Sequence, residues 1–236
     1  MTVFHKFRNV LFTILIENHE DSALSSKPTL VRQDATPERR THSLLRHPVF
    51  ALIGLRPILG QHTYAEDRAL RDWATGRSRL VEIGVAEGAS AVTLRRVMSP
   101  EGSLWLIDPF HLSRVQRLNA MKRLAHRAVN DINNGRVVWI NKFSFEAVKA
   151  WVDQIDFLFL DGDHSETGVQ RDWDDWHQYV IPGGVVAFHD AAIFRGGWPQ
   201  PNWGPVRVVE RLFRSRVLSE WRIVHEVDSL VVVQRS

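Results

Sequence analysis

The sequence LVEIGVAEGAS, residues Leu80–Ser90, predicts a strand, a tight turn and the start of a helix. Its first residues are apolar and suit a strand, and Glu82 among them is expected to face out. Gly84 and Gly88 follow, and Ser90 opens a run with helical spacing of apolar residues. Glycines at such a turn let the backbone bend sharply and let a ligand approach the N–H groups at the positive end of a helix. The stretch therefore predicts an α/β protein with a ligand site at this turn.

The glycines of this turn have the spacing G-x-x-x-G. A turn that cradles the pyrophosphate of a dinucleotide has the spacing G-x-G-x-x-G. A nicotinamide-dependent Rossmann oxidoreductase is therefore kept only as an alternative. A non-catalytic ligand-binding module is the other alternative that the turn leaves open.

Length and composition indicate one globular domain with an appendage. The chain has 236 residues, of which 44% are hydrophobic and 24% are charged, as is typical of soluble globular proteins. The formal net charge is only +3, so the charge does not indicate a nucleic acid partner. The chain contains no cysteine, which excludes disulfides, thiolate metal sites and a cysteine nucleophile. Any metal must therefore bind to oxygen or imidazole.

Residues 1–62 are expected to form an N-terminal appendage, because prolines and polar stretches separate its apolar pieces. The apolar run Val10–Ile16 is too short to span a bilayer, and no small-residue cleavage site follows it. We expect an amphipathic helix there that packs on the domain or on a second subunit, with anchoring at a membrane surface as the alternative. The segment His47–Gly60 is expected to be a lid or a dimer contact. A cytoplasmic homodimer without stable membrane insertion is the resulting expectation.

Residues 63–236 alternate strands and helices, which predicts a doubly wound, mostly parallel sheet with helices on both faces. Thr63 and Glu66 form the capping box of the first helix and are interpreted as structural. The expected strands after the glycine turn are Ser103–Ile107, Val137–Ile140, Ile155–Leu160 and Val185–Phe188. Two further runs, Trp221–Val227 and Leu230–Gln234, have the spacing of an antiparallel hairpin. The predicted fold is a Rossmann-like α/β fold with a seven-stranded sheet and a C-terminal antiparallel hairpin.

Polar residues follow the predicted parallel strands at their carboxyl ends. In an open α/β sheet these ends share one edge, and ligands bind there. The residues at this edge are Gly84 with Ser90, Asp108, Phe143 with Ser144, Asp161 with His164, and His189 with Asp190. Asp108 suits a carboxylate that accepts both hydroxyls of a ribose, with a helix cap as the alternative. A purely structural protein has no reason to gather such groups, so the pattern predicts a binding site or an active site.

The stretches LVEIGVAEGAS, LWLIDPF and IDFLFLDGDHSETGVQRDWDDWHQYVIPGGVVAFHDA resemble the class I S-adenosylmethionine-dependent methyltransferases. Within that class they look like small-molecule O-methyltransferases, a group that includes bacterial sugar and polysaccharide methyltransferases. The resemblance extends over about Gly60–Ser236 and is strongest over Asp156–Ala191. It implies transfer of a methyl group to a hydroxyl of a small polar acceptor, with a sugar or oligosaccharide as the implied acceptor.

The resemblance also assigns a group of residues to the cofactor S-adenosylmethionine. These residues are Glu82, Gly84, Gly88, Ser90, Asp108, Phe143 and Ser144. The residues of the glycine turn would hold the methionine part, and Asp108 would hold the ribose. Phe143 and Ser144 would border the adenine.

Methyl transfer to a hydroxyl needs groups that orient the acceptor and remove its proton. His164 is the candidate general base, because imidazole titrates near working pH; a histidine that merely faces water is the alternative. Related sugar methyltransferases place a metal-binding aspartate three residues before a histidine base, and Asp161 and His164 have that spacing. Both are therefore candidate catalytic residues.

Asp161, His189 and Asp190 are the candidate ligands of a divalent cation, Mg²⁺ or Mn²⁺. Many relatives carry two acidic or amide residues after the fifth strand, whereas this chain has His189-Asp190. Imidazole is a poor ligand for Mg²⁺ and a good one for Mn²⁺, Fe²⁺ or Zn²⁺, so the identity of the metal stays open. Asp163 could substitute as a ligand or cap the next helix, and the cap is the favoured interpretation.

The loop AAIFRGGWPQPNWGP, after the fifth strand, carries Arg195, Trp198 and Trp203 among glycines and prolines. These side chains suit stacking on a sugar ring, and tryptophans that fix the loop are the structural alternative. For Gln61 and His62, ahead of the capped helix, the sequence leaves open whether they face the cleft.

Overall fold

The structure is a computed structural model that describes residues 58, 60–110, 119–215 and 218–236. The predicted helix at Val10–Ile16 and most of the segment His47–Gly60 lie outside the described residues. None of the helices within these described ranges combines the length and the apolar character that crossing a membrane requires.

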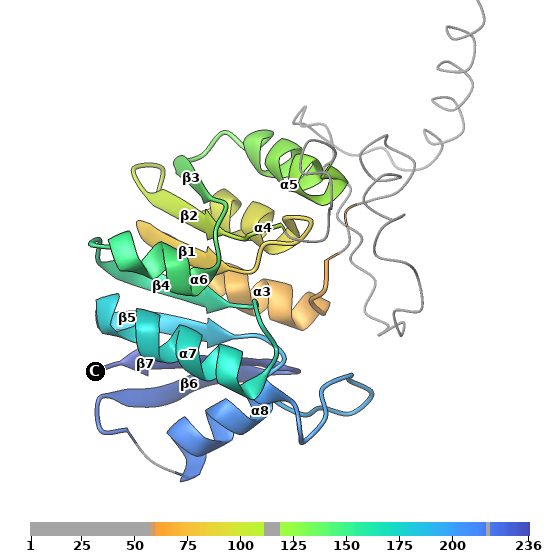
Figure 1. Cartoon of the computed structure of the whole chain (residues 1–236), viewed down its shortest axis with the longest axis vertical. Helices are drawn as coiled ribbons and strands as arrows, with labels where there is room; N and C mark the ends of the chain where they lie inside the picture. Colours follow the sequence, from red (N-terminus) through yellow and green to blue (C-terminus); the bar gives the residue numbers. More distant parts are fainter. Residues whose placement is uncertain (1–57, 59, 111–118, 216–217) are drawn as a thin grey trace, which may run out of the picture.

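A twisted sheet of seven strands forms the centre of the described structure (Figure 1). The strands are β1 (Arg79–Ile83), β2 (Ser103–Ile107), β3 (Arg136–Ile140), β4 (Ile155–Leu160), β5 (Val180–Phe188), β6 (Trp221–Val227) and β7 (Leu230–Arg235). Their order across the sheet is β3-β2-β1-β4-β5-β7-β6. Strands β1 to β5 run parallel, and β7 pairs antiparallel with both β5 and β6. The predicted Rossmann-like fold with a C-terminal antiparallel hairpin is confirmed.

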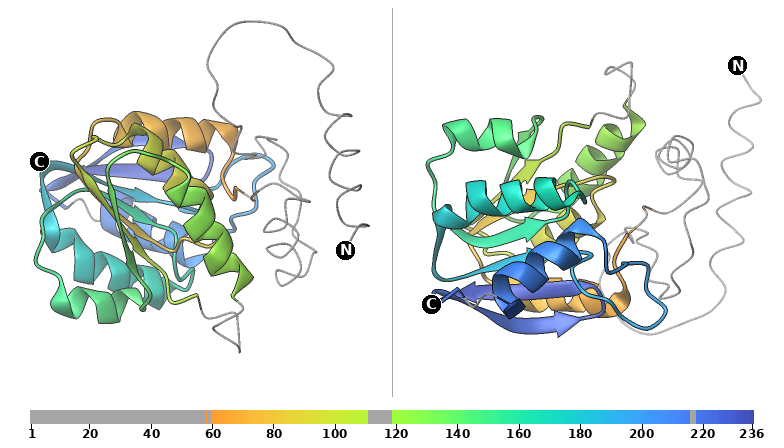
Figure 2. Two further views of the ribbon diagram at one scale, coloured as in Figure 1. Left: turned by 90° about the horizontal axis from the view of Figure 1, so that it is seen from above. Right: turned by 60° about the horizontal axis from the view of Figure 1, so that its bottom comes forward.

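Helices cover both faces of the sheet (Figure 2). They are α3 (Tyr64–Ala74), α4 (Ala89–Val97), α5 (Ala120–Asn130), α6 (Ser144–Ala147), α7 (Glu166–Trp176) and α8 (Gly204–Val209). Helices α3, α4 and α5 share one apolar core with the sheet, and α6, α7 and α8 share the other. Along β4, Phe157 and Phe159 belong to the first core, and Leu158 and Leu160 belong to the second. This alternation explains the continuous apolar run, because a central parallel strand is buried on both faces.

The predicted strand bounds agree closely with the structure, with one difference in β5. Strand β4 has the predicted bounds, whereas β5 begins at Val180 instead of Val185. The Pro-Gly-Gly segment at residues 182–184 is therefore part of the strand and not a turn before it. The pairing of β4 with β5 is irregular at this segment: its register shifts between Ile155 and Phe157.

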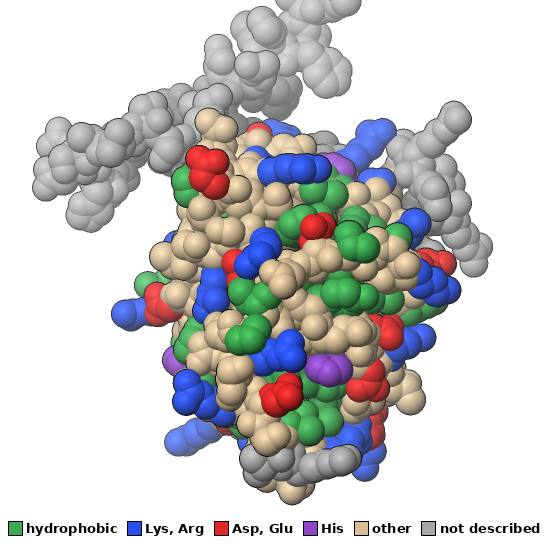
Figure 3. All heavy atoms as spheres, turned by 90° about the vertical axis from the view of Figure 1, so that its left-hand side faces the viewer, with side chains coloured by type: hydrophobic (Ala, Val, Ile, Leu, Met, Phe, Trp, Pro, Cys, Tyr) green, Lys and Arg blue, Asp and Glu red, His purple; other side chains and the backbone are tan. Residues whose placement is uncertain are grey.

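The surface drawn in Figure 3 mixes charges of both signs, with Lys and Arg side chains interspersed among Asp and Glu. This mixture agrees with the small net charge of +3. Among the described surface ion pairs, Arg207 lies 3.0 Å from Glu166 and Arg235 lies 3.5 Å from Glu220. Exposed pairs of this kind contribute little to stability.

The two halves of the sheet meet where β1 lies beside β4, because the chain winds outward from β1 to β3 and then returns to β4. At this point Gly84, after β1, lies against the backbone of Asp161, after β4. Gly84 has a φ of +89°, and a Cβ on it would stand 2.1 Å from the carbonyl oxygen of Asp161. Only glycine fits such a position. The sequence predicted this glycine for a turn and a ligand, and the structure adds a backbone contact between the two halves of the sheet.

The change Gly84→Ala is therefore expected to destabilise the fold strongly. The positive φ alone costs a residue with a side chain about 1–2 kcal/mol, and the clash with Asp161 adds to this cost. We expect the free energy of unfolding, measured by urea denaturation, to fall by more than about 3 kcal/mol.

Gly183→Ala is the matched control, because Gly183 has a φ of +76° but nothing within 4 Å of its added Cβ. Its free energy of unfolding should fall only by the backbone cost of about 1–2 kcal/mol. Equal losses for the two variants would contradict the contact between Gly84 and Asp161.

Candidate active site

The glycine turn between β1 and α4 is tied to the end of β2 by Asp108. Its Oδ2 accepts hydrogen bonds from the backbone N–H groups of Val85 at 2.9 Å and Ala86 at 3.0 Å. Its Oδ1 accepts one from the N–H of Phe110 at 2.6 Å. Ala86 and Phe110 both have a positive φ, 47° and 50°, which is uncommon for residues other than glycine. Asp108 thus holds two unusual turns side by side and keeps acceptor capacity on Oδ1 for a further donor.

Glu82 is buried, and the prediction that it faces out is wrong. Its exposed fraction is 0%, because β1 is a central strand covered by helices on both faces. Oε1 accepts a hydrogen bond from the Ser90 hydroxyl at 2.5 Å, and Oε2 has no hydrogen-bond partner among the described residues. Burial raises the pKa of Glu82 well above its usual range, the Ser90 bond opposes this shift, and the charges of Asp161 and Asp108 add to it. Three acidic residues at the ends of β1, β2 and β4 are therefore close enough to affect one another.

Ser144, predicted to border the cofactor, uses its hydroxyl within the protein. It donates a hydrogen bond to Asp172, a buried residue of α7. Burial raises the pKa of Asp172 to about 6, against the opposing effects of the Ser144 bond and of Arg171. Phe143 is 37% exposed, and its ring stacks on Phe145 with 5.1 Å between centroids.

Asp161, His164, His189 and Asp190 converge at the carboxyl ends of β4 and β5, and we call them the acid–histidine cluster. Nδ1 of His189 lies 2.9 Å from Oδ1 of Asp161. Nε2 of His164 lies 3.0 Å from Oδ2 of Asp190 and 3.6 Å from Oδ1 of Asp161. The structure thus brings together the residues that the sequence placed at the ends of two different strands.

Neighbouring carboxylates and imidazoles shift one another's pKa within the cluster. Burial opposes protonation of His189, but Asp161, Glu66 and Asp190 together raise its pKa well above its usual range. The hydrogen bond to Asp190 raises the pKa of His164. Burial opposes ionisation of Asp190, but its contacts with His164 and His189 lower its pKa to about 2. The acid–histidine cluster is therefore a network of electrostatically coupled acidic and basic groups.

Glu66 reaches the cluster from α3, and the sequence interpretation missed this contact. The predicted capping box is confirmed: the Thr63 N–H donates to Oε2 of Glu66 at 2.8 Å, and the Glu66 N–H donates to Oγ1 of Thr63 at 3.2 Å. The same carboxylate is 0% exposed and accepts hydrogen bonds from the N–H and hydroxyl of Ser229 at 2.7 and 2.6 Å. Its Oε2 lies 3.5 Å from Nε2 of His189. Burial opposes its ionisation, but these contacts lower the pKa of Glu66 to about 2.

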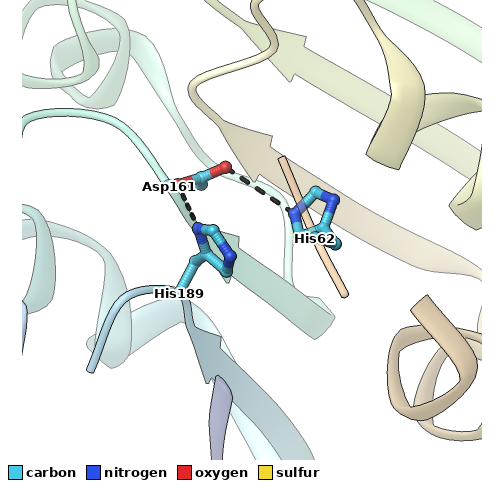
Figure 4. Close-up of side chains that lie close together, drawn as sticks. All are labelled: His62, Asp161 and His189. Carbon is cyan, nitrogen blue, oxygen red and sulfur yellow. Dashed lines mark hydrogen bonds and ion pairs between the residues drawn. The ribbon is translucent and has the colours of Figure 1, made fainter. Parts of the chain in front are cut away.

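His62, ahead of the capped helix, points into the cluster (Figure 4). Its Nε2 lies 3.8 Å from Oδ2 of Asp161, and its side chain is 6% exposed. Its ring centroid is 4.6 Å from that of His189. Burial and then the charge of His189 lower the pKa of His62, so its imidazole is neutral at neutral pH. The orientation that the sequence left open is thus toward the site.

Two tryptophans of the loop after β5 face the cluster. Nε1 of Trp198 donates a hydrogen bond to Oδ1 of Asp190 at 2.5 Å. The ring of Trp203 meets that of His164 edge to face, with 6.2 Å between centroids. Asp190 itself has a positive φ of 54°, and its bonds to Trp198 and His164 hold it there. Of the two interpretations that the sequence left open, Trp198 therefore has the structural one: it fixes the loop.

Asp163 lies beside the cluster and supports the start of α7. The N-cap of that helix is Ser165, whose hydroxyl accepts a hydrogen bond from the N–H of Gly168 at 3.0 Å. Asp163 accepts one from the N–H of Ser165 at 2.9 Å. The interpretation of Asp163 as a helix cap is thus corrected: Asp163 lies two residues before the N-cap and supports it.

The donor atoms of the cluster fit a divalent cation. Two overlapping groups offer three donor atoms each, all within 4.8 Å of one another. The first group is His62, Asp161 and His189, and the second is His164, His189 and Asp190. Imidazole nitrogen and carboxylate oxygen suit Mn²⁺, Fe²⁺ and Zn²⁺. A ligating imidazole must be neutral, so a bound cation would displace any proton from the nitrogen that it uses as a ligand.

Comparisons with known proteins identify the fold. Residues 81–191, from β1 to just beyond the cluster, match the sequence model of a methyltransferase domain family. An uncharacterized protein of Acanthamoeba polyphaga mimivirus is 32% identical over 120 residues, which are 49% of this chain and 52% of that protein. The chain thus spans about half the length of this curated relative.

Solved structures of methyltransferases have the same fold. The O-methyltransferase from Bacillus cereus in complex with S-adenosylhomocysteine has a TM-score of 0.54 and 15% identity, covering 81% of this chain and 89% of that chain. The O-methyltransferase NovP has a TM-score of 0.54 and 16% identity, covering 77% and 84%. A methyltransferase from Geobacter sulfurreducens has a TM-score of 0.51 and 15% identity, covering 84% and 91%. The resemblance to class I S-adenosylmethionine-dependent methyltransferases is confirmed, because residues 81–191 match a methyltransferase domain family and these solved structures share the fold.

The buried carboxyl of Asp172 predicts a pH dependence of stability. Its pKa of about 6 in the folded state exceeds the 3.8 of an exposed aspartate. Between these values the folded state binds more protons than the unfolded state, so stability decreases as the pH rises from about 4 to 6. Asp172→Asn removes this dependence. We expect the variant to gain about 3 kcal/mol relative to wild type between pH 4 and pH 7, measured by urea denaturation.

Asp174→Asn, on the exposed side of the same helix, is the control. Its stability relative to wild type should stay nearly constant over the same pH range. A constant difference for Asp172→Asn as well would contradict the raised pKa of Asp172.

Proposed function

We propose that the protein transfers a methyl group from S-adenosylmethionine to a hydroxyl of a small polar acceptor, and that the acceptor is a sugar or oligosaccharide. The observation that carries the proposal is the group of three acidic residues, Glu82, Asp108 and Asp161, at the ends of adjacent strands in a methyltransferase domain. Within this group, Oε2 of Glu82 is the most informative atom, because it has no hydrogen-bond partner among the residues that the structure describes. A buried carboxylate oxygen without a donor is costly, and a cationic ligand would supply one.

The charge of this edge distinguishes S-adenosylmethionine from a dinucleotide. S-Adenosylmethionine carries a sulfonium and an ammonium group, whereas a nicotinamide dinucleotide carries a pyrophosphate. Asp161 and Asp108 already raise the pKa of Glu82, so the edge repels further negative charge and attracts positive charge. The G-x-x-x-G spacing disfavours a dinucleotide independently. The oxidoreductase is therefore not favoured.

Each cofactor residue has a proposed contact. Glu82 would accept from the ammonium group, and the turn from Gly84 to Ser90 would enclose the methionine part. Oδ1 of Asp108 would accept from the ribose hydroxyls. Phe143 would cover the adenine with its ring, and Ser144 would contribute its backbone, because its hydroxyl is bonded to Asp172. The cofactor supplies an electrophilic methyl group next to these residues.

His164 is the proposed general base. Its Nδ1 lies 3.1 Å from the carbonyl oxygen of Gly162, and because a carbonyl only accepts, Nδ1 carries a hydrogen. Nε2 would then take the proton of the acceptor hydroxyl, while S-adenosylmethionine would supply the methyl group and leave as S-adenosylhomocysteine. Asp190, 3.0 Å away, stabilises the imidazolium that results. With a side chain that is 38% exposed, His164 is the member of the acid–histidine cluster most open to an acceptor.

A divalent cation held by Asp161, His189 and Asp190 is a further part of the proposal. Such an ion would favour the ionised form of an acceptor hydroxyl and orient it. The positions of these groups support this role, because Nδ1 of His189 lies 2.9 Å from Oδ1 of Asp161 and 3.6 Å from Oδ1 of Asp190. Trp203, next to His164, offers an aromatic face to a sugar ring. A homodimer remains a prediction from the sequence.

Cofactor binding tests the acidic edge directly. We expect calorimetric titration of the full chain to detect S-adenosylmethionine and not NADH. Glu82→Gln keeps the shape and the Ser90 contact but removes the charge, and should raise the Kd for S-adenosylmethionine about tenfold, since a hydrogen bond to a charged group contributes about 1.5–3 kcal/mol.

Glu101→Gln, in the exposed turn before β2, should leave that Kd unchanged. Unaltered affinity in Glu82→Gln would remove Glu82 from the cofactor site. Binding of NADH without S-adenosylmethionine would overturn the proposed function.

The role of His164 is tested by separating binding from transfer. We expect His164→Gln to bind S-adenosylmethionine as wild type does and to lose methyl transfer by about 100-fold or more, because general base catalysis typically contributes 100- to 10,000-fold. Formation of S-adenosylhomocysteine with a panel of sugar acceptors is the readout. His225→Gln, on β6, is the control and should transfer at the wild-type rate. Full activity of His164→Gln would exclude His164 as the base.

A further inference from the structure

The imidazole of His62 is a buried polar group with an unused nitrogen. Its side chain is 6% exposed, and Nε2 has no hydrogen-bond partner in the described part of the chain. Burying a polar nitrogen without a partner costs about 1–3 kcal/mol. The surroundings of the ring explain why the cost is not relieved within the protein: its ring neighbours are Phe159, with centroids 5.7 Å apart, and His189 at 4.6 Å.

The unused nitrogen points at Asp161 from a distance that suits an ion between them (Figure 4). Nε2 of His62 is 3.8 Å from Oδ2 of Asp161, which is too long for a hydrogen bond. Two ligand atoms at about 2.0–2.2 Å from one metal ion lie roughly 3–3.5 Å apart. A small closure of the side chains would therefore bring both atoms into ligand range.

His189 presents its Nδ1 to the same place. Nδ1 lies 2.9 Å from Oδ1 of Asp161, while Nε2 on the other side of the ring lies 3.5 Å from Oε2 of Glu66. Glu66 is itself held by Ser229 and Thr63. A carboxylate behind an imidazole fixes which nitrogen faces a metal and strengthens that nitrogen as a ligand. Glu66 occupies that place behind His189 at 3.5 Å, where it makes no hydrogen bond with Nε2.

We propose that His62, Asp161 and His189 bind one divalent transition-metal ion, and that the two imidazoles make the site prefer ions such as Zn²⁺ or Co²⁺ over Mg²⁺. This inference rests on the proposed cation site of the methyltransferase; it keeps Asp161 and His189 of that site and adds His62 as a ligand from outside the strand ends. Imidazole suits Zn²⁺, Fe²⁺ and Co²⁺, whereas Mg²⁺ requires oxygen ligands. His62, just ahead of α3, therefore contributes to the selectivity of the site for one metal ion over another.

Metal titrations of the full chain test this inference. The protein is stripped with EDTA, dialysed and titrated by calorimetry with Zn²⁺, Co²⁺ or Mg²⁺ in the absence of S-adenosylmethionine. The visible absorption of Co²⁺ reports imidazole ligation without interference from thiolates, because the chain has no cysteine. We expect Co²⁺ and Zn²⁺ to bind at least about 100-fold more tightly than Mg²⁺. His62→Gln should weaken Co²⁺ and Zn²⁺ binding at least about tenfold and change the Co²⁺ spectrum.

His225→Gln removes a histidine from β6, outside the cluster, and should leave both affinities and the spectrum unchanged. Equal affinity of the wild type for Mg²⁺ and Co²⁺ would overturn the inference even if His62→Gln proved unstable. Wild-type Co²⁺ affinity in a folded His62→Gln variant would overturn it as well. Failure to bind S-adenosylmethionine would instead contradict the proposed function and leave the measured metal preference standing.

Discussion

The contact between Gly84 and the carbonyl of Asp161 is the constraint on which the site depends. It allows the turn after β1 and the turn after β4 to touch at the middle of the sheet. The first turn carries the proposed cofactor residues, and the second leads into the acid–histidine cluster. A side chain at residue 84 would push these two turns apart. The proposed methyl donor site would then lie farther from the proposed base. The methyltransferase chemistry proposed here requires that these groups be held within one reaction distance.

The acid–histidine cluster and the acidic edge around Glu82, which lie on the two sides of this contact, differ in how their acidic groups are compensated. The acid–histidine cluster is compensated from within, because His164 and His189 pair with Asp161, Asp190 and Glu66. The acidic edge around Glu82 has no described basic partner, and only the Ser90 hydroxyl bonds to its carboxylate. Burial and the neighbouring acids raise the pKa of Glu82, and a cationic ligand would favour its ionised form, so this edge is suited to such a ligand. The cluster beside it is suited to proton transfer and to a metal ion that replaces its protons.

Much of the fold and part of the site could be predicted from the sequence, because both follow from the periodicity of a parallel sheet. Strand carboxyl ends share one edge, so Asp161, His164, His189 and Asp190 were expected together, and the structure brings them together. Glu82 was wrongly expected to face out, because alternation fails in a strand covered on both faces.

The roles of Glu66, His62 and Asp172 could not be predicted from the sequence. Each depends on a contact with a residue that is distant in the chain. The capping box accounted for Glu66 within its own helix, and nothing local indicated that its second oxygen reaches Ser229, 163 residues away. His62 had no periodic pattern to place it. Asp172 did carry a signal, since it interrupts the apolar stripe of α7 between Val169 and Trp176, but its partner Ser144 comes from a different helix.

The most direct test of the account is a crystal structure of the full chain with S-adenosylhomocysteine bound. We expect the ligand at the carboxyl ends of β1 and β2, with its ammonium group against Oε2 of Glu82 and its ribose hydroxyls on Asp108. The thioether sulfur should face the acid–histidine cluster across the contact between Gly84 and Asp161. A ligand bound elsewhere, or one that touches neither carboxylate, would contradict the central claim that this acidic edge is the cofactor site.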